Sequence, residues 1–285
     1  MESFAFEAIG TKWHIELDAD VESAKEIMQK VFECIERFDK NYSRFREDSL
    51  ITEMAKTAGT YTLPADAEPL FDLYVDLYGK TEGKVTPLIG ETLSQAGYDA
   101  TYSFTPSALT KPPSWEEVLT YRYPTLTLSK PALLDLGACG KGYLVDIIAE
   151  QLRVHGVASY LIDAGGDMRI RQKEGARIGL EHPGDASAVI GVVTLQEGSI
   201  CGSAGNRRAW EGYTHILDPK TLTSPTSILS VWVVAKTALI ADALATCLFF
   251  VEPEALSGYA YEYAILNSDY YLKRSKEFPA EFFSS

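Results

Sequence analysis

Cysteine and histidine are scarce in this chain, with four of each among 285 residues. The cysteines are widely separated, and none forms the CxxC spacing of a zinc or redox site; they are Cys34, Cys139, Cys201 and Cys247. This spacing excludes a cysteine cluster as the centre of function. We expect four buried, reduced thiols, which are typical of a cytoplasmic protein.

Positive charge and long apolar runs are also in short supply. Lys and Arg number 26 against 40 Asp and Glu, which gives a formal net charge of −14. Non-specific nucleic-acid binding needs clustered positive charge, so nucleic acid is excluded as a partner. No segment reaches the roughly 18 continuous apolar residues of a membrane span. The opening MESFAFEAIG lacks the basic and apolar regions of a signal peptide, so we expect a cytoplasmic protein.

Helical and strand-like patterns alternate irregularly along the chain. Apolar spacing predicts helices over 21–38, 64–78, 142–156 and 241–250. Alternating or continuous apolar runs predict strands within 4–17, 125–129, 159–166, 168–172, 176–181, 188–195, 229–235 and 261–273. Because regular βαβ alternation is missing, we expect an α+β fold with mixed or antiparallel sheets and packed helices. We expect one domain over 1–285, which allows for two closely packed lobes.

Two polar segments are expected to be loops. NYSRFREDS spans 41–49, and Ser49 is placed to cap a short helix after it. Segment 79–113 is rich in Gly, Thr, Pro and Ser, and long irregular segments of this kind often line a site.

The stretch ADALATCLFF, 241–250, places one carboxylate and one hydroxyl in a nearly apolar helix. Asp242 and Thr246 are four residues apart and therefore share a face. A buried carboxylate needs a partner, which here can be a helix N-terminus, a basic side chain or a metal ion. Thr246 also has a structural role open to it, a hydrogen bond back to the carbonyl of residue 242. Oxygen ligands of this kind suit Mg²⁺.

The stretch DLGACGKGYLVD, 135–146, places three glycines and Lys141 ahead of a predicted helix. Backbone N–H groups in such a turn can approach a phosphate, and Lys141 adds positive charge. The spacing matches neither GxxxxGK[ST] nor GxGxxG, so a tight connection is an equal alternative.

Two further stretches carry polar residues. In DAGGDMRI, 163–170, Gly165 and Gly166 follow a predicted strand and mark either close approach to the backbone or a tight turn. In GSAGNRRAWEGYTHILDPKT, 202–221, Arg207 and Arg208 could grip phosphate, and His215 is either catalytic or a structural hydrogen-bonding residue.

Taken in order, these four stretches resemble the ApbE family, the FAD:protein FMN transferases. The family shows D-L-G-G-[IL]-[AG]-K-G-Y, N-A-G-G-D-[IL]-R, a Ser-Gly before H-I-[IL]-D-P-[RK]-T-G, and A-D-A-L-A-T-[AC]-L-F. This chain reads DLGACGKGY, DAGGDMR, GSAGNRR before HILDPKT, and ADALATCLF. Weaker echoes are IGTKWHI at 9–15, FDKNYSRFREDSLITEM at 38–54 and TEGKVTPLIG at 81–90. The resemblance runs from about residue 7 to 270.

The resemblance implies an Mg²⁺-dependent enzyme that uses FAD as substrate. It would transfer the FMN half to a threonine of an acceptor flavoprotein, form a phosphoester bond and release AMP. This is a phosphoryl-type transfer, in which positioning and charge neutralisation supply most of the catalysis. Two alternatives remain open: hydrolysis of FAD to FMN and AMP, and FAD binding without chemistry.

The resemblance also implies roles for individual residues. Asp242, Thr246 and the carbonyl of Ala138 correspond to metal ligands, and Asp242 and His215 to catalytic residues, with the exact role of His215 left open. Residues that correspond to FAD contacts are Ile9, Phe45, Val85, Thr86, Asp135, Lys141, Gly165, Gly166 and Ile216.

Several positions depart from the family pattern. Ile9 replaces the usual Met, Asp163 replaces Asn, Ala204 replaces Gly, and the turn after HILDP lacks its glycine. Lys84-Val85-Thr86 stands where the family has A-F-D. These departures affect substrate contacts and leave the Asp242–Thr246 pair unchanged.

Overall fold

The computed structural model describes residues 1–283, without the side chains of Ala186 and Arg207. Its main element is an antiparallel sheet in the order β1-β2-β6-β7-β8-β11-β12-β13, with β14 paired to β8. Its strands are β1 Glu2–Ala8, β2 Thr11–Leu17, β6 Tyr160–Asp163, β7 Asp167–His182, β8 Asp185–Ala204, β11 Ile228–Ala235, β12 Tyr261–Asn267, β13 Leu272–Arg274 and β14 Ala280–Phe282. The predicted α+β class with antiparallel strands is confirmed.

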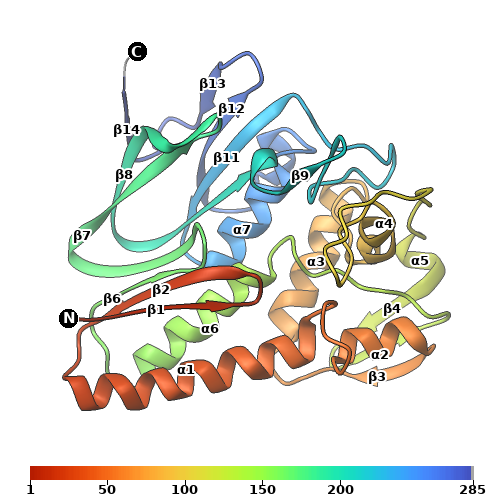
Figure 1. Cartoon of the computed structure of the whole chain (residues 1–285), viewed down its shortest axis with the longest axis horizontal. Coiled ribbons are helices and arrows are strands. Elements are labelled where there is room, and N and C mark those ends of the chain that lie inside the picture. Colours follow the sequence, from red (N-terminus) through yellow and green to blue (C-terminus); the bar gives the residue numbers. More distant parts are fainter. Residues whose placement is uncertain (284–285) are drawn as a thin grey trace.

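Three helices cover one face of this sheet: α1 Val21–Tyr42, α6 Gly140–Val154 and α7 Ala238–Cys247 (Figure 1). The two-residue period of β11 shows how the faces divide. Val231 and Val233 join the core under the helices, whereas Trp232 joins a smaller cluster on the other face with Phe278. Apolar residues therefore lie on both faces of the sheet.

Most of the remaining elements form a second group beside the sheet (Figure 1). They are α2 Leu50–Lys56, α3 Glu68–Lys80, η1 Pro87–Ile89, α4 Gly90–Gln95, α5 Trp115–Val118, and a three-stranded sheet of β3 Gly59–Thr62, β5 Thr125–Leu128 and β4 Leu119–Arg122. Leu70 and Phe71 of α3 belong to the same buried cluster as Leu144 of α6. The main core thus runs without a break through both groups of elements.

Most predicted elements are present, with changed boundaries. The predicted strands at 168–172 and 176–181 are one strand, β7, and the strand at 188–195 is part of the longer β8. The first helix continues to Tyr42, and Ser49 caps α2 as expected, accepting from the Thr52 N–H at 3.0 Å. Five short strands were not predicted from the sequence, because each has only two to four residues: β3, β4, β14, β9 Ala209–Trp210 and β10 Tyr213–Thr214.

The four cysteines are buried and free, as expected. Among the described residues, every helix is too short or too polar to span a bilayer. The expected cytoplasmic location stays a prediction.

Candidate active site

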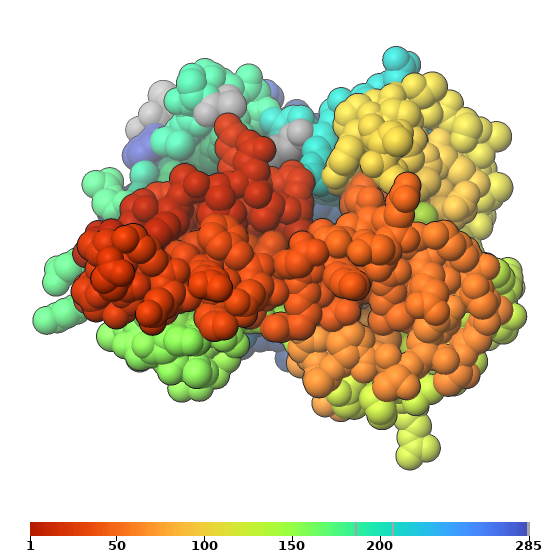
Figure 2. All heavy atoms as spheres, turned by 60° about the horizontal axis from the view of Figure 1, so that its bottom comes forward, coloured from red at the N-terminus to blue at the C-terminus, as the bar shows by residue number. Residues whose placement is uncertain are grey.

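A cavity of about 740 Å³ lies between the large sheet and the second group of elements. In Figure 2, the β1–β2 turn (red) and the segment around residue 100 (yellow) stand on opposite sides of a hollow. Of the residues that the family resemblance assigns to the site, all except Gly166 line this cavity: Ile9, Phe45, Val85, Thr86, Asp135, Ala138, Lys141, Gly165, His215, Ile216, Asp242 and Thr246. Of the two arginines considered for phosphate binding, Arg208 also lines it, and the side chain of Arg207 lies outside the described residues. The sequence-predicted residues therefore converge on one place.

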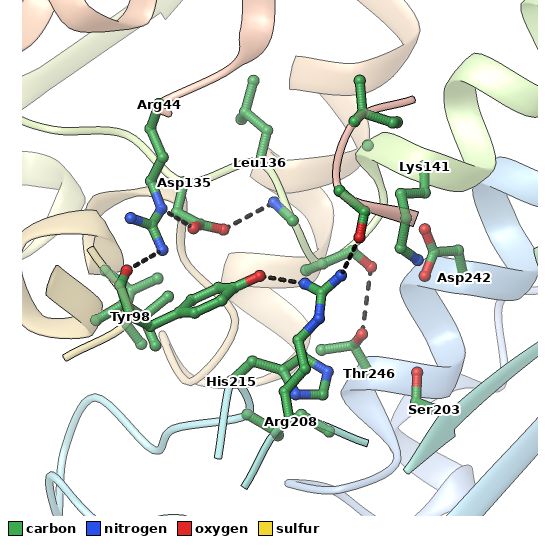
Figure 3. A pocket seen from close by; sticks show the side chains of 18 of the residues that line it. Arg44, Tyr98, Asp135, Leu136, Lys141, Ser203, Arg208, His215, Asp242 and Thr246 are labelled. Carbon is green, nitrogen blue, oxygen red and sulfur yellow. Dashed lines mark hydrogen bonds and ion pairs between the residues drawn. The ribbon is translucent and has the colours of Figure 1, made fainter. Parts of the chain in front are cut away.

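Helix α7 brings Asp242 and Thr246 to the cavity wall. The Thr237 side chain caps its first turn, and its alanine and leucine side chains are buried in the core. Asp242 is only 3% exposed. The Thr246 hydroxyl donates to the Ala138 carbonyl at 3.3 Å instead of turning back to residue 242 (Figure 3). A carboxylate and a hydroxyl of α7 and the carbonyl of Ala138, in the turn before α6, thus line the same cavity.

Helices α6 and α7 exchange caps at their N-terminal ends. The Gly142 N–H, in the first turn of α6, donates to Asp242 Oδ2 at 2.9 Å. In return, Asp146 of α6 accepts from the Ala238 and Leu239 N–H groups of α7 at 3.0 and 2.8 Å. First-turn N–H groups have no partner within their own helix, and carboxylates stabilise that end. The exchange fixes the position of Asp242 relative to the glycine-rich turn.

One of the glycines in DLGACGKGYLVD, Gly142, is required for a steric reason. A β-carbon at this position would lie 2.2 Å from the Ala238 carbonyl oxygen and 2.7 Å from Asp242 Cβ. Only glycine lets the two helices approach closely enough for the Gly142–Asp242 hydrogen bond.

Asp242, Asp167 and Lys141 interact electrostatically, but the lysine forms its ion pair with Asp167 and not with Asp242. Lys141 forms its ion pair with Asp167, which is 2% exposed. Burial, and then the charge of Asp167, raises the pKa of Asp242, while Lys141 and the Gly142 N–H act to lower it. Burial acts to lower the pKa of Lys141, but the carboxylates of Asp167 and Asp242 outweigh it and raise the pKa. Among the described residues, Asp242 has no ion pair of its own.

The oxygen atoms of Asp242, Thr246 and Ala138 form a group that we call the Asp242–Thr246 corner, and they suit a hard divalent cation as ligands. Its oxygens come from a carboxylate, a hydroxyl and a carbonyl, the ligand types that Mg²⁺ prefers. Within residues 1–283, no group of three His, Cys, Asp or Glu side chains is placed to hold a metal. A site with one carboxylate depends on further oxygens from solvent and from a phosphate ligand, which is usual for Mg²⁺.

Asp135 is held by an arginine that the sequence-based prediction missed. Arg44, whose side chain is 2% exposed, forms a buried ion pair with Asp135 and donates to the Tyr98 carbonyl at 2.7 Å. Asp135 also accepts from the Gly137 N–H at 2.8 Å. The sequence signal was a lone arginine beside Phe45 in a loop, but its partner lies 91 residues away.

Aromatic rings form the wall opposite α7. Phe45 and Tyr102 are stacked, with centroids 5.2 Å apart and planes 7° from parallel. Tyr98 contacts Phe45 edge-on at 5.5 Å and stacks on Trp210 at 5.8 Å. The Arg44 guanidinium lies 4.2 Å from the Phe45 ring centroid. Flat aromatic ligands bind well against such a wall. Tyr98 and Tyr102 line the cavity but were not predicted as site residues, and Trp210 supports the wall from behind Tyr98.

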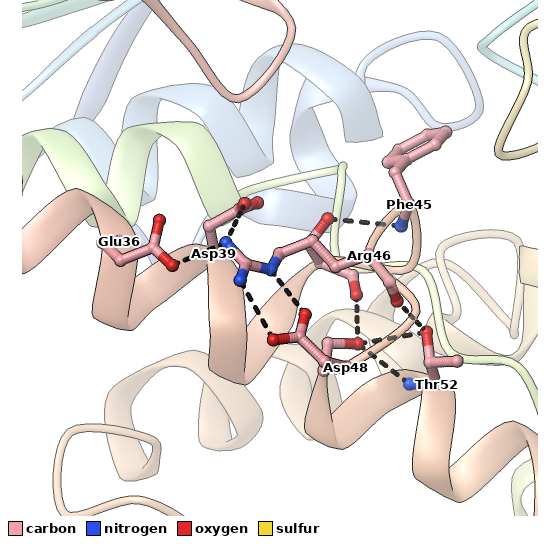
Figure 4. Close-up of polar contacts among 8 residues, drawn as sticks. Glu36, Asp39, Phe45, Arg46, Asp48 and Thr52 are labelled. Carbon is pink, nitrogen blue, oxygen red and sulfur yellow. Dashed lines mark hydrogen bonds and ion pairs between the residues drawn. The ribbon is translucent and has the colours of Figure 1, made fainter.

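The loop that carries Phe45 is braced by Arg46 (Figure 4). Arg46 forms ion pairs with Glu36, Asp39 and Asp48 at 2.8, 3.2 and 2.9 Å. The Thr52 hydroxyl donates to the Arg46 carbonyl at 2.5 Å. The loop is thus tied to α1 and α2, and Phe45 is free to face the cavity.

The β1–β2 turn and the diglycine meet at the rim. Gly165 has φ +70°, and a β-carbon there would lie 2.1 Å from Thr11 Oγ1, so the two segments approach closely. Ile9 has φ +42°, a strained value for a β-branched residue. Gly166 does not line the cavity; its N–H donates to Asp163 at 2.8 Å, which fits the tight-turn alternative.

Val85, Thr86 and Ile216 form smaller parts of the wall. Val85 and Thr86 are buried, and the Thr86 hydroxyl accepts from the Leu88 N–H at 3.2 Å, which caps η1. The Ile216 N–H donates to the Thr214 hydroxyl at 3.1 Å.

His215 faces the cavity beside Arg208 (Figure 3). Burial, and then the charges of Arg208 and Lys141, lowers its pKa to about 4. Its Nδ1 is buried and has no hydrogen-bond partner among the described residues. A neutral imidazole with an uncommitted nitrogen can accept a proton or a hydrogen bond from a ligand.

Comparison with known proteins places this geometry in context. The sequence profile of the ApbE family matches residues 9–265. A FAD:protein FMN transferase from Vibrio cholerae is 28% identical over 76% of this chain and 68% of its own length. One from Escherichia coli is 25% identical over 86% of this chain and 77% of its own. The crystal structure of the ApbE protein from Thermotoga maritima has a TM-score of 0.83 at 22% identity, covering 98% of this chain and 99% of that one.

Proposed function

Since the chain belongs to the ApbE family, we propose that it transfers the FMN moiety of FAD to a threonine of an acceptor flavoprotein, with Mg²⁺ as cofactor. The observation that carries the proposal is the meeting of Ala138, Asp242 and Thr246 in one cavity with His215 and an aromatic wall. The proposal agrees with the names of the curated relatives, which are FAD:protein FMN transferases.

The bond changes in the proposed reaction balance without a redox partner. The threonine Oγ attacks the phosphorus of the FMN half, and the bond from that phosphorus to the bridging oxygen breaks. AMP leaves with the bridging oxygen, and a phosphoester joins FMN to the acceptor. The threonine proton passes to His215, whose low pKa keeps the imidazole neutral near pH 7.

Other residues of the site have binding and positioning roles in the proposed reaction. Asp242, Thr246 and the Ala138 carbonyl would hold Mg²⁺, which when bound neutralises negative charge on the diphosphate. Asp146 and Gly142 keep Asp242 in place through the exchanged caps. Phe45 and Tyr102 offer a surface for the flavin ring, and Asp135 is available to its polar edge or to a hydroxyl of the ribityl chain.

The test combines the protein with FAD, Mg²⁺ and an acceptor that contains a D-x-x-[ST]-G-A-T segment. We expect flavin fluorescence on the denatured acceptor, and an equal amount of AMP in solution. An acceptor with alanine in place of the threonine should stay unlabelled. AMP release without any labelling would support FAD hydrolysis instead, and tight FAD binding with no AMP at saturating Mg²⁺ would support a binding protein.

A further inference from the structure

The cations that line the cavity differ in their partners. Three of them are in ion pairs with carboxylates: Arg44 with Asp135, Lys141 with Asp167, and Arg46 with three acidic side chains. Lys84 and Arg208 also line the cavity, but neither has a carboxylate within 4 Å among the residues that the structure describes. A cation facing a cavity without a counter-charge favours an anionic ligand.

The position of Lys84 is explained by a hydrogen bond within the fold. Its Nζ donates to the Phe250 carbonyl at 3.2 Å, just beyond the C-terminal end of α7. Carbonyl groups at a helix end attract cations, so this contact explains the position of Lys84 without a ligand.

Arg208 is held in a different way. It ends the short 3₁₀ helix η2, Gly205–Arg208, and its guanidinium reaches across to two other segments. Nη1 donates to the Tyr98 hydroxyl, and Nη2 donates to the Gly10 carbonyl at 3.2 Å (Figure 3). Both acceptors are neutral, so they orient the guanidinium without neutralising its charge.

We propose that Arg208 binds the diphosphate of FAD, and that Tyr98 and Gly10 orient its guanidinium for that purpose. A guanidinium has five N–H donors in a planar fork that matches phosphate oxygens, and the two hydrogen bonds of Arg208 to Tyr98 and Gly10 leave donors free. Its neighbours in the cavity include His215, whose pKa it helps to lower, and the Asp242–Thr246 corner. This inference rests on the proposed function and names the residue that recognises the charged part of its substrate.

The experiment measures FAD binding without an acceptor, so it does not depend on whether transfer occurs. Arg208→Gln should raise the FAD Kd by about 10- to 100-fold, because hydrogen bonds to a charged group are lost. Tyr98→Phe removes one orienting contact but keeps the charge, and it should raise the Kd by only about threefold. Arg153→Gln is the control for the loss of one positive charge, because Arg153 is paired with Glu150 at the exposed end of α6 and does not line the cavity; its FAD Kd should match that of wild type.

Two results would overturn the proposal. One is an unchanged FAD Kd in folded Arg208→Gln. The other is an equal loss in Tyr98→Phe, which would mean that Arg208 only ties the two segments together. Should Arg208→Gln fail to fold, phenylglyoxal modification of wild-type Arg208, followed by mass spectrometry, decides. Protection by FAD and by inorganic pyrophosphate, but not by riboflavin, supports the proposal, and equal labelling in all three overturns it.

Discussion

The two walls of the cavity differ in the chemical groups that form them. The α6–α7 wall is made of backbone N–H and C=O groups and buried carboxylates, and its helices are locked together by exchanged caps. The opposite wall is made of aromatic side chains on loops, of which Tyr102 is more than a third exposed. A rigid polar wall suits charge and a metal ion, whereas a loop-borne aromatic wall suits flat rings. FAD has both parts, a charged diphosphate and two ring systems.

The largest expected effect tests the polar wall at its centre. Asp242→Asn keeps the shape and an acceptor for the Gly142 N–H but removes the negative charge. Turnover should fall by about a thousandfold or more, because the proposed Mg²⁺ site would lose its only carboxylate. The metal-free variant should be at least as stable as wild type at pH 7, since burial disfavours the charged carboxylate. Turnover within tenfold of wild type at saturating Mg²⁺ would exclude Asp242 as a metal ligand.

The second effect tests the contact between the two helices. Gly142→Ala places a β-carbon against the Ala238 carbonyl and Asp242. We expect a loss of about 1–3 kcal/mol in the free energy of unfolding, together with a higher Mg²⁺ requirement. Gly156→Ala is a control at a positive-φ glycine with no atom within 4 Å, and it should lose stability without changing the Mg²⁺ requirement. Equal Mg²⁺ dependence in the two variants would mean that the close approach serves the fold alone.

The third effect tests the aromatic wall. Phe45→Ala removes the ring that stacks on Tyr102 and contacts Tyr98. The KM for FAD should rise about tenfold while kcat changes little, because ring contacts act on binding. If kcat fell with KM unchanged, the aromatic wall would be acting on the reacting groups, and the division of labour between the walls would be wrong.

The smallest effect concerns His215, between the walls. Its imidazole should stay neutral from pH 8 to about pH 5 and titrate near 4, against an ordinary 6.5. Since the unfolded chain takes up this proton near 6.5, the stability from the neutral ring is complete above that pH and is lost as the pH falls towards 4. NMR titration of the histidine ring protons, assigned with His215→Asn, measures the midpoint. A midpoint near 6.5 would place the ring in solvent.

The sequence predicted the polar wall better than the aromatic one, for a physical reason. Asp242 and Thr246 are one helical turn apart, and Ala138 and Lys141 belong to one glycine-rich turn, so short stretches carry the pattern. Arg44 and Asp135 become partners only when segments 91 residues apart meet. Tyr98 and Tyr102 lie in a segment without periodicity, so nothing local marks them as parts of a wall. Strand boundaries were predicted less well, because β7 and β8 run through bulges that interrupt their alternation.

The exchanged caps have a consequence for anyone who wishes to redesign this protein. Asp146 and Asp242 each complete the other's helix, so randomising either position would perturb the framework and the chemistry together. Variation directed at 99–113 would leave that framework and the Tyr98–Arg208 contact untouched while reshaping the cavity beside Tyr102. A library built there offers the better route to a catalyst that accepts altered flavins.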